Sequence, residues 1–323
     1  MTSRLKIFII AFLISLPFFV GINYAEKELS DFLFWRELAL NPQIFKAEIS
    51  LEQKWHSMKP IRDSRAEDLE INASGAISIL VDGNGKERIL FEKNSREKLP
   101  IASLTKLMTA WVVLDYYNLE NKITISEKAA SHFGDRRGLP QGRTFTVEYL
   151  LYPLLMESNN GVAFALANDY SGMSQENFVE IMNKVALENG LTNTYFSNPS
   201  GLDPDNADTI NYSTAYDLAK LTEKLLEKPL VWQILSLPKY SEYGPELNNT
   251  NLFLINNNTD WHEKIIGGKT GYTRQAGGCL MLVLKMPRGQ GYLINVILGT
   301  EERDLRFDEM KNLIDWLKTA YKW

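Results

Sequence analysis

A serine and a lysine three residues apart could form the nucleophile and base of a hydrolase. Ser103 and Lys106 are separated by Leu104 and Thr105, and side chains three residues apart on a helix lie on one face. A lysine in an apolar environment loses its charge readily, so it can take the serine proton and leave an alkoxide-like nucleophile. The spacing therefore predicts Ser103 as the nucleophile and Lys106 as its base.

The same spacing occurs elsewhere in the chain, so context must decide among the matches. The three other matches are Ser3/Lys6, Ser95/Lys98 and Ser236/Lys239. The first lies in the basic flank of an apolar run, the second in a charged, turn-like stretch, and the third contains Pro238, which blocks a continued helix. Only Ser103 begins an apolar helical pattern, where free backbone N–H groups attract negative charge. An isolated match would more often be an ordinary helix cap.

A second polar element follows Ser103 after 55 residues. Ser158, Asn159 and Asn160 interrupt two helical patterns with small polar side chains. Such a run is usually only a turn. In a hydrolase, Ser158 would relay a proton near Lys106, and the Asn160 amide would hydrogen-bond the backbone of a bound peptide.

A third element precedes a strand pattern. Lys269, Thr270 and Gly271 follow Gly267 and Gly268. Lys269 and Thr270 would hold a substrate carboxylate, and the glycines would let an extended substrate lie against the edge of the strand. The interpretation of these residues as a nucleotide-binding loop fails, because Glu263 occupies the position of its first glycine.

The elements that position these motifs follow from the hydrophobic pattern. Two apolar runs, 76–81 and 88–91, flank an Asp/Gly/Asn turn and predict a hairpin. Helical periodicity is found in residues 103–117, 147–155, 161–169, 175–188 and 213–226, the last with Ser213 as the expected cap. Strand patterns at 279–285 and 292–298 precede a final amphipathic helix at 305–321. This order predicts an α+β fold. Its antiparallel sheet is formed by the amino- and carboxy-terminal parts of the domain, is flanked by helices, and encloses an all-helical insertion.

The amino terminus predicts export. Residues 7–25 carry no charge and follow Arg4 and Lys6, so they can just cross a bilayer, with the rest of the chain translocated. Asn23-x-Ala25 is a poor cleavage site, which favours a retained anchor in the cell membrane over a signal whose removal would leave a secreted or periplasmic protein. We therefore expect an anchor or signal segment at 1–25, a membrane-proximal spacer at 26–70, and a catalytic domain at 71–323 on the extracytoplasmic side.

Composition excludes several classes of function. The net charge is -5, whereas a nucleic-acid-binding surface needs clustered Lys and Arg. A single cysteine, Cys279, rules out an intramolecular disulfide and every cysteine-based zinc site, and we expect it to be a buried small hydrophobe. With three histidines and no H-E-x-x-H, the sequence predicts neither a metal nor a cofactor.

The three motifs, in this order, resemble those of serine penicilloyl-binding enzymes. From about residue 76 to 321 the chain resembles the D-alanyl-D-alanine carboxypeptidases among the low-molecular-mass penicillin-binding proteins, peptidase family S11. Three further stretches, 100–110, 178–183 and 196–202, carry the resemblance. It implies a β-lactamase/transpeptidase-like fold. It also implies peptidoglycan stem peptides ending in D-Ala-D-Ala as substrates and β-lactam antibiotics as covalent inhibitors.

The resemblance also implies a role for each site residue. Ser103 is the acylated nucleophile, Lys106 its base, and Ser158 with Asn160 the second element. Lys269, Thr270 and Gly271 form the third. The backbone N–H groups of Ser103 and Tyr272 form the oxyanion hole. An arginine after the last strand helps to bind the terminal carboxylate, and Arg306 matches its position better than Arg303.

The chain departs from the family's usual pattern in two places. The second motif more often reads S-G-N, whereas Asn159 stands in the middle here. Many members also carry a carboxy-terminal β-domain and an amphipathic membrane helix, whereas this chain stops at Trp323. We therefore expect attachment through the amino-terminal segment.

Three alternative functions remain open. A D,D-endopeptidase would cleave peptidoglycan cross-links with the same site. A class A-like β-lactamase would need the glutamate of E-x-x-L-N, but in residues 244–248 that position holds Gly244. A non-catalytic cell-wall protein would keep the fold without turnover, although every catalytic position is occupied here.

Overall fold

The computed structural model describes residues 29, 60–131, 139–204, 210–241, 246–255, 264–286 and 291–323. The chain separates into two compact units, Met1–Ala66 with Lys318–Trp323, and Glu67–Leu317. Each is described by itself. The predicted boundary between residues 70 and 71 stays a prediction.

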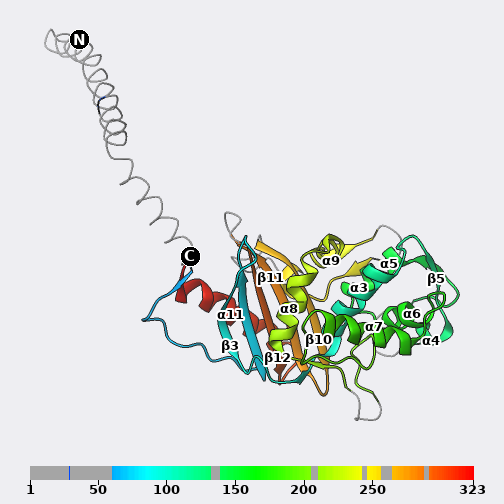
Figure 1. Cartoon of the computed structure of the whole chain (residues 1–323), viewed down its shortest axis with the longest axis horizontal. Helices are drawn as coiled ribbons and strands as arrows, with labels where there is room; N and C mark the ends of the chain where they lie inside the picture. The colour runs from blue at the N-terminus through cyan, green and yellow to red at the C-terminus, as the bar shows by residue number, and fades with distance from the viewer. Residues whose placement is uncertain are drawn as a thin grey trace, which may run out of the picture. The chain divides into compact units, whose positions relative to one another are not determined.

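A five-stranded antiparallel sheet, in the order β10-β11-β12-β2-β3, forms one end of the larger unit (Figure 1). Its strands are β2 (Gly75–Val81), β3 (Glu87–Lys93), β10 (Ile265–Thr273), β11 (Gly277–Lys285) and β12 (Tyr292–Thr300). Two of them come from the beginning of the unit and three from its end. The predicted α+β fold, with an antiparallel sheet built from both parts of the domain, is confirmed.

The hairpin β2–β3 forms where the apolar runs flank a turn sequence. Asp82 Oδ1 accepts hydrogen bonds from the backbone N–H groups of Asn84 (2.8 Å) and Lys86 (2.9 Å), and Gly85 takes the left-handed φ of 76° that the turn requires. Every residue of β2 is buried. A strand is buried along its whole length only when both faces of its sheet are covered.

Helices cover both faces of the sheet. On one face, Ile77 and Ile79 join a continuous hydrophobic core with residues of α8 (Ala215–Leu225), which packs on β2 and β12. Side chains alternate between faces along a strand, so Phe91, which pairs with Ser78, points to the opposite face. There it meets Trp316 of α11 (Leu305–Ala320) edge to face, with ring centroids 5.7 Å apart.

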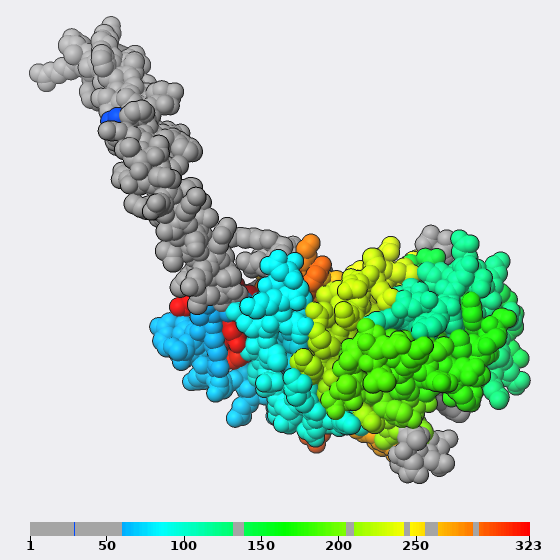
Figure 2. Space-filling model, viewed as in Figure 1, coloured from blue at the N-terminus to red at the C-terminus, as the bar shows by residue number. Residues whose placement is uncertain are grey.

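The helical part lies beyond β10 in Figure 1. Its helices are α3 (Thr105–Tyr116), α4 (Glu127–Ala130), α5 (Val147–Leu155), α6 (Asn160–Asn168) and α7 (Gln175–Glu188). A further helix, α9 (Pro229–Leu235), packs against β10. In Figure 2 the yellow-green surface of α8 and α9 lies between the cyan hairpin and the green helices.

Two details of the helical part differ from the sequence expectation. The cap of α8 is Thr214, whose Oγ1 accepts a hydrogen bond from the N–H of Asp217 at 2.9 Å, because Ser213 belongs to a strand. The insertion also holds short strand pairs that are too brief to show periodicity. They are β5 (Lys122–Thr124) with β6 (Thr144–Thr146), and β8 (Lys239–Tyr240) with β9 (Leu247–Asn248), followed by the short helix α10 (Leu252–Ile255). A further pair joins β4 (Leu99–Pro100), which lies just before Ser103 in the sequence, to β7 (Tyr212–Ser213).

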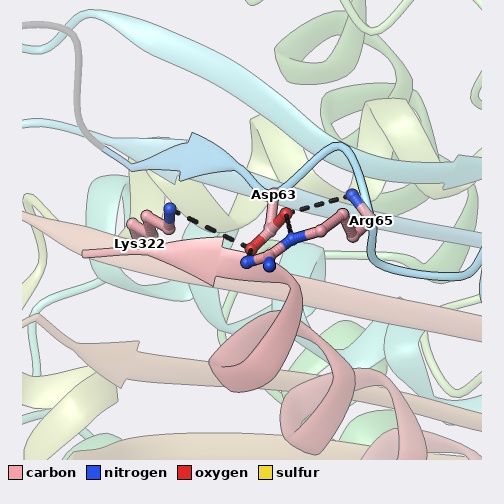
Figure 3. A network of polar contacts seen from close by, with 3 residues as sticks. All are labelled: Asp63, Arg65 and Lys322. Carbon is pink, nitrogen blue, oxygen red and sulfur yellow. Dashed lines mark hydrogen bonds and ion pairs between the residues drawn. The ribbon is translucent and has the colours of Figure 1, made fainter.

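In the smaller unit, β1 (Ile61–Arg62) pairs antiparallel with β13 (Tyr321–Lys322). Just after β1, the Asp63 carboxylate accepts two hydrogen bonds from the Arg65 guanidinium, at 3.1 and 2.8 Å, and one from its backbone N–H (Figure 3). These hydrogen bonds hold the pKa of Asp63 well below its usual range. Lys322 Nζ lies 4.0 Å from the same carboxylate.

Among the described residues, no helix has the length and apolar character needed to span a membrane. The predicted anchor or signal at 7–25, and nearly all of the predicted spacer up to residue 59, lie outside the described residues.

Candidate active site

Ser103 lies in a single 3-10 turn, η1 (Ala102–Leu104), directly before α3. The turn begins with a strained residue, since Ala102 has a φ of 47°. A residue with a Cβ in this left-handed region costs about 1–2 kcal/mol. Ala102 lies between β4 and α3, and the Ser103 side chain that follows it remains partly accessible.

Lys106, one turn further along, is fully buried and points back to Ser103. Its Nζ lies 2.9 Å from Ser103 Oγ, 2.7 Å from Asn160 Oδ1 and 2.7 Å from the carbonyl oxygen of Ser200. A neutral amine has two N–H donors and one lone pair. The two acceptors from Asn160 and Ser200 can use both donors, and the lone pair is then directed at the Ser103 hydroxyl. This arrangement is suited to removing the Ser103 proton.

The Ser200 carbonyl is brought to Lys106 by a loop that lies against the Ser103 turn. Gly201 has a φ of 79°, and a Cβ built on it would lie 1.9 Å from the carbonyl oxygen of Ala102. Only glycine allows this approach. The loop is held to α3 by Thr109 Oγ1, which donates to the carbonyl of Pro199 at 2.6 Å.

Two asparagines fix the shape of this loop. Asn198 Oδ1 accepts hydrogen bonds from the backbone N–H groups of Ser200 (3.1 Å) and Gly201 (2.7 Å). Buried Asn211 accepts from the N–H of Asn198 at 3.1 Å and donates to Thr105 Oγ1 at 2.9 Å. The residues around Ser200 and Asn211 were not predicted as site residues, although stretch 196–202 carried part of the family resemblance.

The second motif lies at the start of α6. Asn160, its first residue, hydrogen-bonds Lys106 instead of leaving its whole amide to a bound peptide. Asn159 caps the helix, since its Oδ1 accepts a hydrogen bond from the N–H of Val162 at 2.8 Å. Ser158 has a left-handed φ of 62°, and within the described residues its buried Oγ has no hydrogen-bond partner. A strained residue with an unpaired buried hydroxyl is typical of a functional site.

The third motif was expected to precede a strand, but it lies within one, β10, which is an edge strand of the described sheet. Lys269 is fully buried, and its Nζ donates to the carbonyl of Thr270 at 2.9 Å. Burial, with smaller effects from the positive charges of Lys106 and Arg306, lowers the pKa of Lys269 well below its usual value. Lys106 and Arg306 are therefore near enough to Lys269 to disfavour a positive charge on it.

Thr270 has a partner that the sequence did not reveal. Its Oγ1 lies 2.6 Å from Thr250 Oγ1, and the backbone N–H of Thr250 donates to the carbonyl of Met156, two residues before Ser158. Thr250 therefore connects the second and third motifs.

Gly271 brings β10 against the Ser103 turn. A Cβ built on Gly271 would lie 3.1 Å from the backbone nitrogen of Ser103 and 3.1 Å from the carbonyl oxygen of Ile101. The next residue, Tyr272, has a half-exposed side chain. The backbone N–H groups of Ser103 and Tyr272, predicted to form an oxyanion hole, are therefore close in space.

Of the two candidate arginines, Arg306 lies in the site. It is buried, and one guanidinium NH donates to the carbonyl of Gly271 at 2.8 Å. Burial and the nearby charge of Arg303 lower its pKa to about 10. Arg303 is exposed, with its guanidinium carbon 5.9 Å from the centre of the Tyr272 ring. Within the described residues, neither Lys269 nor Arg306 forms an ion pair.

The rival motifs do not assemble in the same way. Ser95 Oγ donates to Glu92, and Ser236 Oγ donates to the carbonyl of Gln233. Lys239 instead pairs with exposed Glu246 at 2.9 Å, so the glutamate of the β-lactamase-like stretch is on the surface. Gly244 and the Ser3/Lys6 match lie outside the described residues.

No cluster of three or more His, Cys, Asp and Glu side chains in the described part of the chain could hold a metal ion. Cys279 is buried on β11, and burial raises the pKa of its thiol to about 11. Such a thiol is not ionised near neutral pH and is a poor nucleophile.

Comparison with known proteins identifies relatives over most of the chain. The family model described as D-alanyl-D-alanine carboxypeptidase, Peptidase_S11, matches residues 62–302. The chain is 33% identical to the D-alanyl-D-alanine carboxypeptidase DacF of Bacillus subtilis, over 80% of this chain and 65% of that protein. It is 34% identical to a D-alanyl-D-alanine endopeptidase of Pseudomonas aeruginosa, over 77% of this chain and 78% of that protein. The match therefore spans just under two thirds of the Bacillus relative's length.

Solved structures agree with the sequence matches. Penicillin-binding protein D2 of Listeria monocytogenes, in its ampicillin-bound form, superposes with a TM-score of 0.63 at 29% identity. The alignment covers 77% of this chain and 98% of that one.

Proposed function

Because this chain belongs to the D-alanyl-D-alanine carboxypeptidase family, peptidase S11, we propose that it removes the terminal D-alanine from peptidoglycan stem peptides through an acyl-enzyme on Ser103. The observation that carries this proposal is the 2.9 Å contact between Ser103 Oγ and the fully buried Lys106 Nζ.

Acylation begins when Lys106 takes the Ser103 proton and Ser103 Oγ attacks the carbonyl carbon of the penultimate D-alanine. The oxyanion that forms is stabilised by the N–H groups of Ser103 and Tyr272, each worth about 3 kcal/mol in the transition state. The C–N bond then breaks. The proton held by Lys106 passes to the leaving nitrogen through Ser158, whose buried hydroxyl has no hydrogen-bond partner among the described residues.

Deacylation reverses the sequence with water as the nucleophile. Water gives a proton to the site and attacks the ester carbonyl, the C–O bond to Ser103 breaks, and the serine recovers its proton. The products are the shortened peptide and free D-alanine, so no external oxidant, reductant or metal is needed for balance.

The substrate's free carboxylate would bind at Thr270, near Lys269 and Arg306. Both side chains are buried and form no ion pair within the described residues, so a substrate carboxylate could bind there without displacing a described acidic side chain. The peptide backbone would lie along the edge strand β10. β-Lactam antibiotics would acylate Ser103 in the same way, as the ampicillin-bound Listeria neighbour suggests.

Endopeptidase activity is the second candidate, because a relative of similar identity in Pseudomonas is a D-alanyl-D-alanine endopeptidase. Both activities break a D-Ala bond with the same nucleophile. Mass spectrometry of digested peptidoglycan distinguishes them: loss of a terminal D-alanine indicates carboxypeptidase action, and conversion of cross-linked dimers to monomers indicates endopeptidase action.

We further propose that residues 7–25 anchor the domain to the extracytoplasmic face of the cell membrane. The support is the run of 19 uncharged residues after Arg4 and Lys6. Sedimentation with membranes, together with an intact amino terminus by mass spectrometry, would agree with an anchor. A mature amino terminus beyond residue 20 in a released protein would show that the segment is a cleaved signal.

Labelled penicillin and D-alanine release together test the enzymatic proposal. The parent should form a stable covalent adduct and release D-alanine from a stem pentapeptide, and Ser103→Ala should do neither. Ser236→Ala, which removes an exposed serine bonded only to its own helix among the described residues, is the matched control and should behave as the parent. A parent that takes the label without releasing D-alanine would instead be a non-catalytic wall-binding protein.

A further inference from the structure

Arg306 hydrogen-bonds a backbone carbonyl of β10, in addition to its predicted role in binding the substrate carboxylate. Its guanidinium NH donates to the carbonyl oxygen of Gly271 at 2.8 Å. That carbonyl belongs to the peptide unit that joins Gly271 to Tyr272. The N–H of the same peptide unit is the Tyr272 donor assigned to the oxyanion hole in the proposed function.

The geometry of a peptide unit connects these two contacts. A trans peptide is planar, so its C=O and N–H bonds point in opposite directions. The Gly271 carbonyl that Arg306 holds and the Tyr272 N–H therefore face opposite edges of β10.

Ser103 lies close to this peptide unit. A Cβ on Gly271 would come within 3.1 Å of the Ser103 nitrogen, so the two N–H donors can meet at one oxygen atom. Rotation of the Gly271–Tyr272 peptide plane by a few tens of degrees would break this convergence, because hydrogen bonds weaken steeply with angle.

We propose that Arg306 positions the oxyanion hole: by holding the Gly271 carbonyl it fixes the Gly271–Tyr272 peptide plane and directs the Tyr272 N–H at the carbonyl oxygen of the substrate. This inference rests on the proposed function and deepens it. A charged donor on the carbonyl also polarises the peptide, which strengthens its N–H as a donor. Arg306 has this effect on any acyl substrate, whether or not the substrate carries a terminal carboxylate.

Burial supports a fixed role. Arg306 is only 3% exposed, and its Nε has no hydrogen-bond partner within the described residues. Its hydrogen bond to Gly271 ties the guanidinium to the strand that carries the oxyanion donor. The remaining N–H groups of Arg306 can still bind the substrate carboxylate, so Arg306 can both position the oxyanion hole and bind the carboxylate. Two substrates that differ only in the terminal carboxylate separate these roles.

The experiment compares two probes on the full chain: diacetyl-L-Lys-D-Ala-D-Ala and the same peptide with a terminal carboxamide. Arg306→Met should lower kcat about tenfold or more with both probes, since complete loss of an oxyanion donor costs about 10²–10³-fold. Arg306→Lys, which keeps a charged donor, should recover part of the loss. A loss confined to the carboxylate probe, with kcat on the amide unchanged, would assign Arg306 to carboxylate binding alone and overturn the proposal.

A spectroscopic readout makes the test independent of turnover. The ester carbonyl of the penicilloyl-enzyme should absorb at a higher infrared wavenumber in Arg306→Met than in the parent, because a misdirected Tyr272 N–H donates a weaker hydrogen bond. An unchanged band would also overturn the proposal. If the Met variant does not fold, Arg306→Lys is measured in its place and should show a smaller shift in the same direction.

The control variant is Lys311→Gln, which removes one positive charge from the same helix at a side chain that is 53% exposed. It should leave both kcat values and the infrared band unchanged. Failure of the proposed function is distinguishable from failure of this inference. A parent that releases no D-alanine from the carboxylate probe would refute the carboxypeptidase function. The infrared band of the penicilloyl-enzyme would still test whether Arg306 positions the oxyanion hole.

Discussion

Gly201→Ala tests how closely the Ser200 loop approaches the Ser103 turn. The substitution has two costs. A side chain at a φ of 79° costs about 1–2 kcal/mol. The new Cβ would also lie 1.9 Å from the carbonyl oxygen of Ala102, and because that atom belongs to the backbone, relief requires the whole loop to move, at a further cost of about 1–3 kcal/mol.

A matched glycine separates the two costs. Gly190 follows α7 with a φ of 74°, and nothing lies within 4 Å of a Cβ built on it. Gly190→Ala therefore has the backbone cost alone. At about 2–4 °C of Tm for each kcal/mol, we expect Gly190→Ala to lower the Tm by about 2–8 °C and Gly201→Ala to lower it by about 4–20 °C, with Gly201→Ala clearly the less stable.

The functional consequence is measured as the rate of labelling by a fluorescent penicillin. Movement of the loop takes the Ser200 carbonyl away from Lys106 Nζ, which it contacts at 2.7 Å, and disturbs the turn that holds Ser103. Gly201→Ala should therefore label at least tenfold more slowly, and Gly190→Ala should label at the parental rate. Equal Tm values and equal labelling rates for the two variants would refute the close approach and the role given to the Ser200 carbonyl.

Three further changes test separate contacts. Lys106→Ala should slow penicillin labelling about 10³-fold or more, because the base is lost, and labelling at the parental rate would show that Lys106 is not the base. Thr250→Val removes the hydroxyl 2.6 Å from Thr270 Oγ1 and should raise KM for a D-Ala-D-Ala peptide about fivefold, or about 1 kcal/mol, with kcat within about twofold; an unchanged KM would contradict this. Burial lowers the pKa of Lys269 well below the 10.5 of an exposed lysine, so between those two values the unfolded state binds more protons and stability rises with pH. Relative to the non-titrating Lys269→Met, the parent should therefore gain stability in urea unfolding from pH 7 toward pH 10, and a constant difference would place the Lys269 pKa near its ordinary value.

The sheet could be predicted because its signals are local. The apolar runs of β2 and β3 flank Asp82 and Gly85, and a side-chain period of two, a turn residue and a left-handed glycine are all visible within a short segment. The sequence also predicted that both ends of the domain contribute to this sheet, but it did not predict the order of the strands. The short strand pairs β5–β6 and β8–β9 could not be predicted, since two or three residues show no period.

In the site, side-chain roles could be predicted from the sequence, whereas backbone roles could not. Side chains that act through their own chemistry, such as Ser103, Lys106 and Lys269, have recognisable types and spacing, and the structure brings Ser103 and Lys106 into contact. Backbone groups have no such signature. The Ser200 carbonyl at Lys106 and the Gly271 carbonyl at Arg306 would be present whatever side chains those positions carried, so only the fold reveals their roles.

Asn159 shows how far a departure from a motif can be interpreted. The sequence shows only that Asn159 replaces the more usual glycine, and it assigns the Asn159 side chain no chemical role. In the structure its side chain accepts a hydrogen bond from Val162 at the first turn of α6. Such a cap is worth about 1 kcal/mol relative to alanine and only a few tenths relative to glycine. The two residues therefore fulfil nearly the same local requirement. The exchange is tolerated because what the site needs from position 159 is the start of a helix that holds Asn160 at Lys106, and either residue provides it.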